Sequence, residues 1–99
     1  PYDISIIPMI NKNDISALEK ANKINLELEK NNIESIIDDT DENLSSKVKK
    51  MNLIGAPFQI IIGNQSDGEL LEFKELGKET QKINLSQIIK IIKEQKAKN

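Results

Sequence analysis

The order and spacing of the apolar residues predict an α/β fold with a largely parallel sheet. Alternation of apolar and polar residues at the start of the chain gives way to helical spacing, and a short β-branched run follows at once. The same succession of helix and strand then occurs a second time, and crossovers of this kind join parallel strands. The chain has 99 residues, which suffices for one compact domain and is too short for two ordinary cores.

The first crossover is expected near the start of the chain. The segment Tyr2–Ile10 alternates until Pro8 ends regular pairing, which predicts a strand of about six residues. An amphipathic helix should follow, between an N-cap at Asn13-Asp14 and a stop at Asn31-Asn32. We expect its buried side to consist of Leu18, Ala21, Ile24 and Leu28. The β-branched segment Ile33–Asp38 is then predicted to be the second strand.

The second crossover begins after a polar connection. Helical spacing predicts a short helix over Ser46–Leu53, with Gly55 just past its end and Pro57 beyond it. Phe58–Ile62 is the most continuously apolar segment, as expected for a central strand that is covered on both faces.

The last third of the chain predicts two short strands and a helix. The strands are Glu69–Lys74, which follows a glycine-containing turn, and Thr80–Asn84, which follows another. The final helix should begin at Asn84 or Ser86 and fray from Lys93 onward.

The composition excludes most catalytic chemistry. The chain has neither Cys nor His, which removes thiolate nucleophiles, disulfides, Cys/His zinc sites and imidazole bases. All 14 basic residues are lysine and the net charge is −2, so a polyanion would have to be bound locally. No apolar run approaches the roughly 18 to 20 residues of a membrane-spanning helix, which favours a soluble, cytosolic protein. A start at Pro1 without an initiator Met favours a piece of a longer protein.

Four carboxylates follow the second predicted strand within five residues. They are Asp38, Asp39, Asp41 and Glu42. A calcium loop that starts at Asp39 fails, because Leu44 stands where a glycine is needed and Lys50 where a bidentate Glu is needed. A receiver-type phosphoacceptor site fails because the third strand ends in Gly63-Asn64 instead of an Asp. A binding role and a solvated polar loop both stay open.

A cluster of hydroxyl and ammonium groups marks the start of the second helix. It consists of Ser45, Ser46, Lys47, Lys49 and Lys50. A helix N-terminus and three ammonium groups could bind a phosphate, or the lysines could simply be a solvated face. Neither G-x-x-x-x-G-K-[ST] nor G-x-G-x-x-G occurs, which disfavours a nucleotide cofactor.

The element order and one block of sequence resemble a known family. The block is IIDDTDENLSSKVKKMNLIGAPFQIIIG, residues 36–63. With the IIP near the start, it resembles the C-terminal anticodon-binding domain of class II aminoacyl-tRNA synthetases. The acidic loop followed by LIGAP is most similar to bacterial-type prolyl-tRNA synthetases. The resemblance covers nearly the whole chain.

The acidic loop departs from the family pattern DDR-x-x-R-P-G. Thr40 and Asn43 stand in place of both arginines, and Leu44-Ser45 in place of Pro-Gly, so the contacts of those arginines are not carried over. The positions that do match are expected to face tRNA, and they are Asp39, Asp41, Glu42 and Lys47. Lys49 and Lys50 join them as candidate contacts to the RNA backbone.

The resemblance also implies a fold. It is a single anticodon-binding domain over residues 1–99, a three-layer α/β/α arrangement with a mixed five-stranded sheet in the order 2-1-3-4-5, strand 4 being antiparallel. In such a sheet a crevice opens at the carboxyl ends of strands 1 and 3. Pro8, the acidic loop and Gly63-Asn64 should all lie at that edge.

The function implied by the resemblance belongs partly to residues outside this chain. The longer protein would be a proline-tRNA ligase that activates proline with ATP and magnesium in a separate catalytic domain, acts in the cytoplasm and forms a homodimer. Within residues 1–99 we expect no catalytic site, cofactor or metal. The expected partners are the anticodon stem-loop of tRNA(Pro) and the catalytic domain of the longer protein, with no membrane involved.

Hydrogen bonding should dominate base recognition, since the chain has only three aromatic residues. Proline anticodons carry two adjacent guanines, as the resemblance implies, and one carboxylate can accept both N1–H and the N2 amine of a guanine. We expect Asp39, Asp41 or Glu42 to do so, with Lys47 near O6. Two alternatives remain: the anticodon domain of a threonyl, histidyl or glycyl enzyme, and a stand-alone α/β binding module.

Overall fold

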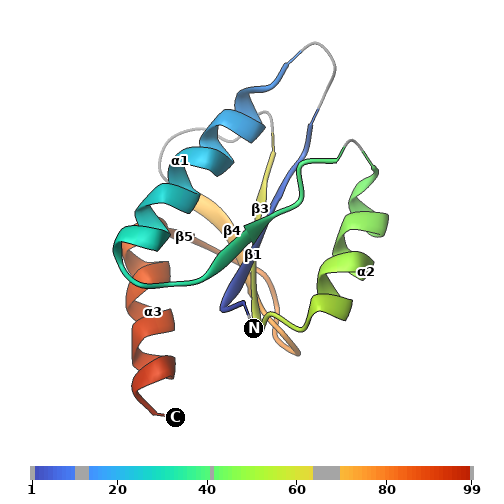
Figure 1. The fold of residues 1–99 in the computed structure, drawn as a ribbon. Coiled ribbons are helices and arrows are strands. Elements are labelled where there is room, and N and C mark those ends of the chain that lie inside the picture. Colours follow the sequence, from blue (N-terminus) through green and yellow to red (C-terminus); the bar gives the residue numbers. More distant parts are fainter. Residues whose placement is uncertain (1, 11–13, 41, 64–69, 99) are drawn as a thin grey trace.

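The computed structural model describes the whole chain except residues 1, 11–13, 41, 64–69 and 99. In the described residues, five strands form one mixed sheet and three helices pack against it (Figure 1). The elements are β1 (Ile4–Pro8), α1 (Ser16–Lys30), β2 (Ser35–Ile37), α2 (Leu44–Ile54), β3 (Phe58–Ile62), β4 (Leu70–Glu75), β5 (Gln81–Asn84) and α3 (Leu85–Ala97).

The sheet has the strand order β2-β1-β3-β4-β5. β1 pairs in parallel with both β2 and β3, and Ile6 lies opposite Ile37 on one side and Ile60 on the other. β4 runs antiparallel to β3 and to β5. The helices α1 and α3 lie on one side of the sheet and α2 on the other (Figure 1). The predicted fold class, strand order and antiparallel fourth strand are confirmed.

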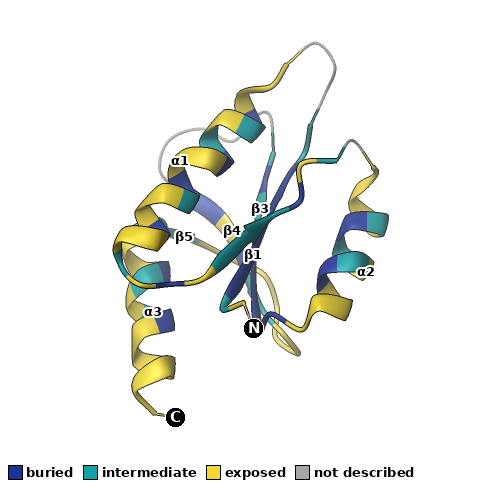
Figure 2. Cartoon of the chain, in the orientation of Figure 1, coloured by how far each residue is buried: buried dark blue, intermediate teal, exposed yellow. Residues whose placement is uncertain are grey.

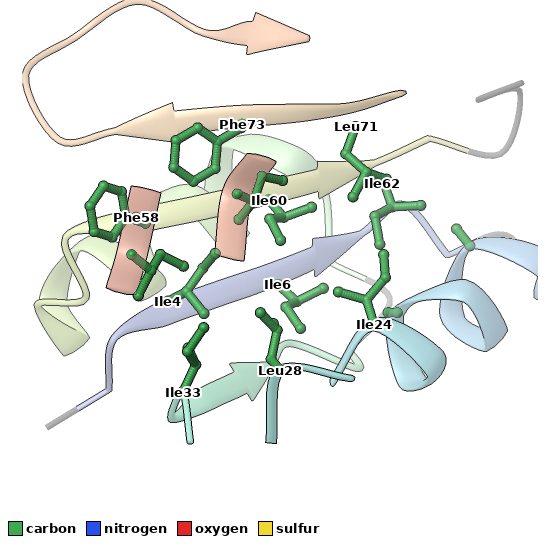
Figure 3. Packing of buried hydrophobic residues seen from close by; sticks show 14 residues of the cluster. Ile4, Ile6, Ile24, Leu28, Ile33, Phe58, Ile60, Ile62, Leu71 and Phe73 are labelled. Carbon is green, nitrogen blue, oxygen red and sulfur yellow. The ribbon is translucent and has the colours of Figure 1, made fainter. Parts of the chain in front are cut away.

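The hydrophobic core lies between the sheet and the pair α1 and α3. Alternate residues of β1 and β3 point into it, among them Ile4, Ile6 and Ile60 (Figure 3). The rings of Phe58 and Phe73 stack there with their centroids 5.4 Å apart. Burial is concentrated in the central strands, and the outer helix faces are exposed (Figure 2). Both phenylalanines are therefore used for packing and are not available to stack on bases.

The first helix differs in detail from the sequence-based expectation. Asn13, half of the expected cap, lies outside the described residues, and the N-cap position is taken by Ile15, whose side chain makes no capping hydrogen bond. Asp14, one residue earlier, accepts a hydrogen bond of 2.9 Å from the N–H of Ser16. Ala17 is buried at the start of the helix, and Leu18 is only half-buried. Leu18 lies about 100° further round the helix axis than Ala17, which turns it away from the core.

The other two helices are longer than expected. α2 begins at Leu44 because the side chain of Asn43 accepts the N–H of Ser46 at 2.9 Å. α3 continues to Ala97 and does not fray from Lys93. Its last turns are tied to the end of α1 and to the start of the chain, since Lys93 donates to Asn31 Oδ1 and Lys96 to Asp3 Oδ2, both at 2.9 Å.

Candidate nucleic-acid interface

The acidic loop lies at the carboxyl edge of the parallel strands. Pro8 ends β1 opposite Ile62 at the end of β3, and the N–H of Asp38 donates to Ile6 O just past the end of β2. The connection to α2 therefore starts beside the ends of β1 and β3. This confirms the expected position of Pro8, the acidic loop and Gly63, while Asn64 lies outside the described residues.

Asp38 organises the start of the loop. Its side chain is almost fully buried, and its Oδ1 accepts the backbone N–H of Thr40 at 3.0 Å, which closes an Asx turn. The Nζ of Lys50 lies 3.2 Å from Asp38 Oδ2. Asp38 is thus a structural residue that joins its own loop to the second turn of α2.

Thr40 and Lys50 link Asp38 to a second carboxylate. The Thr40 hydroxyl lies 2.6 Å from Asp38 Oδ1 and 3.1 Å from Glu42 Oε2. Lys50 Nζ donates to the same Glu42 oxygen at 2.6 Å. Asp38, Thr40, Glu42 and Lys50 together form what we call the carboxylate network. Because the network joins residues on both sides of the loop, it fixes the loop against α2.

The carboxylate network keeps its two acids ionised. Burial of Asp38 raises the pKa of its carboxyl group, but hydrogen bonds from Thr40 and the nearby ammonium groups of Lys50 and Lys47 outweigh this and leave the pKa below its ordinary value. The hydrogen bond from Lys50, assisted by Thr40, lowers the pKa of Glu42. The same bond to Glu42 raises the pKa of Lys50. At neutral pH the network therefore contains two anions and one cation.

Lys47 does not fit the expectation that it touches RNA. Its side chain has no accessible surface, and its Nζ donates to Pro8 O at 2.9 Å and to Asp38 O at 3.3 Å. A buried ammonium group cannot meet a phosphate or a base without leaving this position. The expectation is corrected: Lys47 fastens α2 to the ends of β1 and β2. The spacing could have indicated that Lys47 is buried, because it is one helical turn before the buried Met51 and so lies on the same face of α2.

The remaining candidates are exposed or paired. Asp39 and Lys49 are both exposed, and none of the described residues forms a hydrogen bond or an ion pair with either side chain. Glu42 and Lys50 are partly exposed and paired with each other. Asp41 lies outside the described residues. The edge thus presents one unpaired anion and one unpaired cation among the described candidates.

The residues that replace the two family arginines have structural roles here. Thr40 belongs to the carboxylate network, and Asn43 caps α2. The contributions of Asp38 and Thr40 were not expected from the sequence. An aspartate two residues before a threonine is typical of an Asx turn, so the pattern D-x-T could have revealed this pair.

Two other features are absent from the described part of the chain. Its Asp and Glu side chains form no group of three or more that could bind a metal ion. Among the same residues there is no helix with the length and apolar character needed to cross a membrane.

Two solved structures with the same fold belong to aminoacyl-tRNA synthetases. The RNA-binding domain of threonyl-tRNA synthetase from Cryptosporidium parvum Iowa II superposes with a TM-score of 0.83 at 14% identity, over 95% of this chain and 23% of that one. Prolyl-tRNA synthetase from Cryptosporidium parvum gives a TM-score of 0.80 at 21% identity, over 95% of this chain and 21% of that one. These likenesses define the class of fold: the α/β/α domain that such synthetases carry.

The sequence family is more specific. The model of the anticodon binding domain family matches residues 3–95, and the chain belongs to that family. The proline-tRNA ligase of Pelagibacter ubique is 62% identical over 99 residues, which are all of this chain and 22% of that protein. The proline-tRNA ligase of Fusobacterium nucleatum is 35% identical over 95 residues, 95% of this chain and 17% of that protein. The chain thus spans about a fifth of the length of these relatives.

Proposed function

We propose that this chain is the anticodon-binding domain of a proline-tRNA ligase and that it recognises the anticodon stem-loop of tRNA(Pro). The observation that carries the proposal is the 62% identity to the Pelagibacter ligase along all 99 residues. The longer protein would use ATP and magnesium in its catalytic domain, act as a homodimer and work in the cytoplasm. Residues 1–99 would supply recognition and no chemistry.

We assign base recognition to Asp39. Glu42 is already engaged by Lys50 and Thr40, and Asp38 is buried, whereas Asp39 is exposed and unpaired among the described residues. A free carboxylate can accept the N1–H and N2 amine of guanine together, and adenine offers no such pair of donors. The carboxylate network supports this role because it fixes the turn next to Asp39 before RNA arrives.

We assign a phosphate contact to Lys49. It is exposed on α2, the helix that begins at the same edge, and it has no partner among the described residues. An ammonium group beside an acidic loop also offsets the repulsion between that loop and the RNA backbone. Lys50 contributes indirectly, by holding Asp38 and Glu42.

A binding comparison tests the proposal. The protein is titrated with a proline anticodon arm and with a threonine anticodon arm of the same stem, at several salt concentrations. The proline arm should bind more tightly, and Lys49→Ala should lower the salt slope by roughly 0.7 to 1 without changing the preference between arms. Lys90→Ala, at an exposed position of α3, is the matched control and should leave the slope unchanged. Equal affinity for the two arms would refute the proposal.

A further inference from the structure

The helix α2 is attached to the sheet differently from the other two helices. The hydrophobic core cluster includes buried side chains of α1 and α3, and none of its members in the described chain comes from α2. Of the 11 residues of α2, only Lys47 and Met51 are buried. Among the described helices, α2 is also the only one on its side of the sheet (Figure 1). Burial of apolar surface therefore contributes little to its attachment.

The sheet face beneath α2 is polar at its centre. Ile4 and Ile6 of β1 point into the core, so Ser5 between them faces α2. Ser5 lies opposite Gln59 of β3, and both are buried. The side chain of Gln59 donates to Asn52 Oδ1 of α2 at 2.9 Å, whereas the Ser5 hydroxyl has no hydrogen-bond partner among the described residues. A buried hydroxyl without a partner costs free energy, and this cost disappears when α2 moves away and water reaches Ser5.

The other links between α2 and the sheet involve charged groups that regain water when they separate. Lys47 Nζ donates to Pro8 O and to Asp38 O, and Lys50 Nζ lies 3.2 Å from Asp38 Oδ2. Separation breaks these contacts but restores the hydration of two ammonium groups and one carboxylate. Each contact therefore stabilises the attached helix far less than its strength in isolation. Segments with few buried apolar contacts open more readily than the core on which they rest.

We propose that α2 opens from the sheet as a separate unit, while the core between the sheet and the helices α1 and α3 stays folded, and that RNA binding favours the docked position seen in the structure. The second half rests on the proposed function, because it requires RNA to contact Asp39 and Lys49. Asp39 belongs to the loop before α2 and Lys49 to α2 itself, so their relative positions are fixed only while the helix is docked. An RNA that contacts both residues binds the docked state more tightly, and the opening of α2 thereby regulates the affinity of this edge.

Amide hydrogen exchange of the intact protein, measured by mass spectrometry of its peptides, tests the separate opening. Without RNA, the amides of α2 should exchange faster than the slowest amides of α1, which exchange through global unfolding. Ile92→Val weakens the core, in which Ile92 is 1% exposed, and should accelerate exchange of those α1 amides roughly 2- to 12-fold. It should leave exchange of α2 unchanged, because Ile92 keeps its packing when only α2 opens. Equal acceleration in α1 and α2 would show that α2 opens only with the whole domain, which would overturn the inference.

Two substitutions at the contact between α2 and the sheet should act in opposite directions. Lys47→Met removes the donor to Pro8 O and Asp38 O and should accelerate exchange of α2 about tenfold or more. Ser5→Ala removes the unpartnered hydroxyl and should slow this exchange several-fold. Ser5→Ala and Ile92→Val still decide the question if Lys47→Met fails to fold. Unchanged exchange of α2 in both contact variants would also overturn the inference.

Addition of RNA tests the coupling between docking and recognition. The proline anticodon arm, present at about 100 times its Kd, should slow exchange of α2 about 100-fold if only the docked state binds. A bound arm that left the exchange of α2 unchanged would overturn the coupling. Equal affinity for the proline and threonine arms would instead refute the proposed function, and the separate opening would still be decided by Ile92→Val in the absence of RNA.

Discussion

Replacing Lys47 by methionine removes a buried ammonium group but keeps a side chain of similar length in the same place. Lys47 has no accessible surface, and its Nζ joins Pro8 O and Asp38 O, so the substitution removes the link between α2 and the ends of two strands. Lys49→Met is the matched control, because Lys49 is on the same helix and exposed.

The expected loss of stability follows from the two hydrogen bonds. A buried acceptor that loses its donor costs about 1 to 3 kcal/mol, and two acceptors are affected. Part of this loss of stability is offset, because the substitution also removes the cost of desolvating the ammonium group. We therefore expect Lys47→Met to lower the free energy of unfolding by about 2 kcal/mol, or Tm by roughly 8 to 16 °C for a domain of this size.

Urea denaturation followed by circular dichroism measures the difference. Lys49→Met should change the free energy of unfolding by less than about 0.5 kcal/mol, as expected for an exposed residue. In RNA titrations we expect the opposite ranking of effects. Lys47→Met should leave the salt dependence of RNA binding unchanged, and Lys49→Met should lower it. If the two variants were equally stable, or if Lys47→Met alone changed the salt slope, the structural role assigned to Lys47 would be refuted.

Substitutions at three further positions test local features of the fold and of the site. Asn43→Ala removes the cap of α2 and should cost about 0.5 to 2 kcal/mol in urea denaturation, whereas Asn43→Asp should retain stability; an equal loss in both would contradict capping. Gly55→Ala should lower the free energy of unfolding by about 1 to 2 kcal/mol in the same measurement, because φ at Gly55 is 86°, a conformation that strains an L residue. No atom lies within 4 Å of the added Cβ, so no steric clash adds to this cost. An unchanged midpoint would argue against conformational strain. The lowered pKa values of Asp38 and Glu42 give stability that is present above their ordinary pKa values and lost as the pH falls through the lowered ones. Stability measured from pH 7 down to about pH 3 should therefore decrease less in Lys50→Met than in the wild type, and parallel profiles would exclude the ion pairs as its source.

The fold could be predicted because each element has a strong local pattern. The limits of β3 matched the apolar run Phe58–Ile62, and both crossovers followed from changes of period. Some ends of the helices could not be predicted from local patterns in the same way. The last turns of α3 depend on Lys96 meeting Asp3, a contact between residues far apart in the chain, which no local pattern contains.

The site could be predicted in position but not in detail. The resemblance pointed to the acidic loop and the start of α2, and the structure places both at the carboxyl edge of the parallel strands. Which lysine faces solvent depends on tertiary packing: Lys47 and Lys49 are two residues apart, yet one is buried and the other exposed. Similarly, Glu42 and Lys50 pair across a loop and two helical turns, so sequence spacing alone did not reveal that Glu42 is occupied.

The most direct test of the proposed recognition compares guanine with inosine in the anticodon. Inosine lacks only the N2 amine, so a carboxylate that accepts from this group should bind the inosine arm more weakly. We expect the wild type to prefer the guanine arm by about 1 to 3 kcal/mol, with Lys49→Ala retaining that preference at lower affinity. Asp39→Ala should bind both arms equally. If Asp39→Ala discriminated against inosine as strongly as the wild type, Asp39 would not be the residue that reads the base.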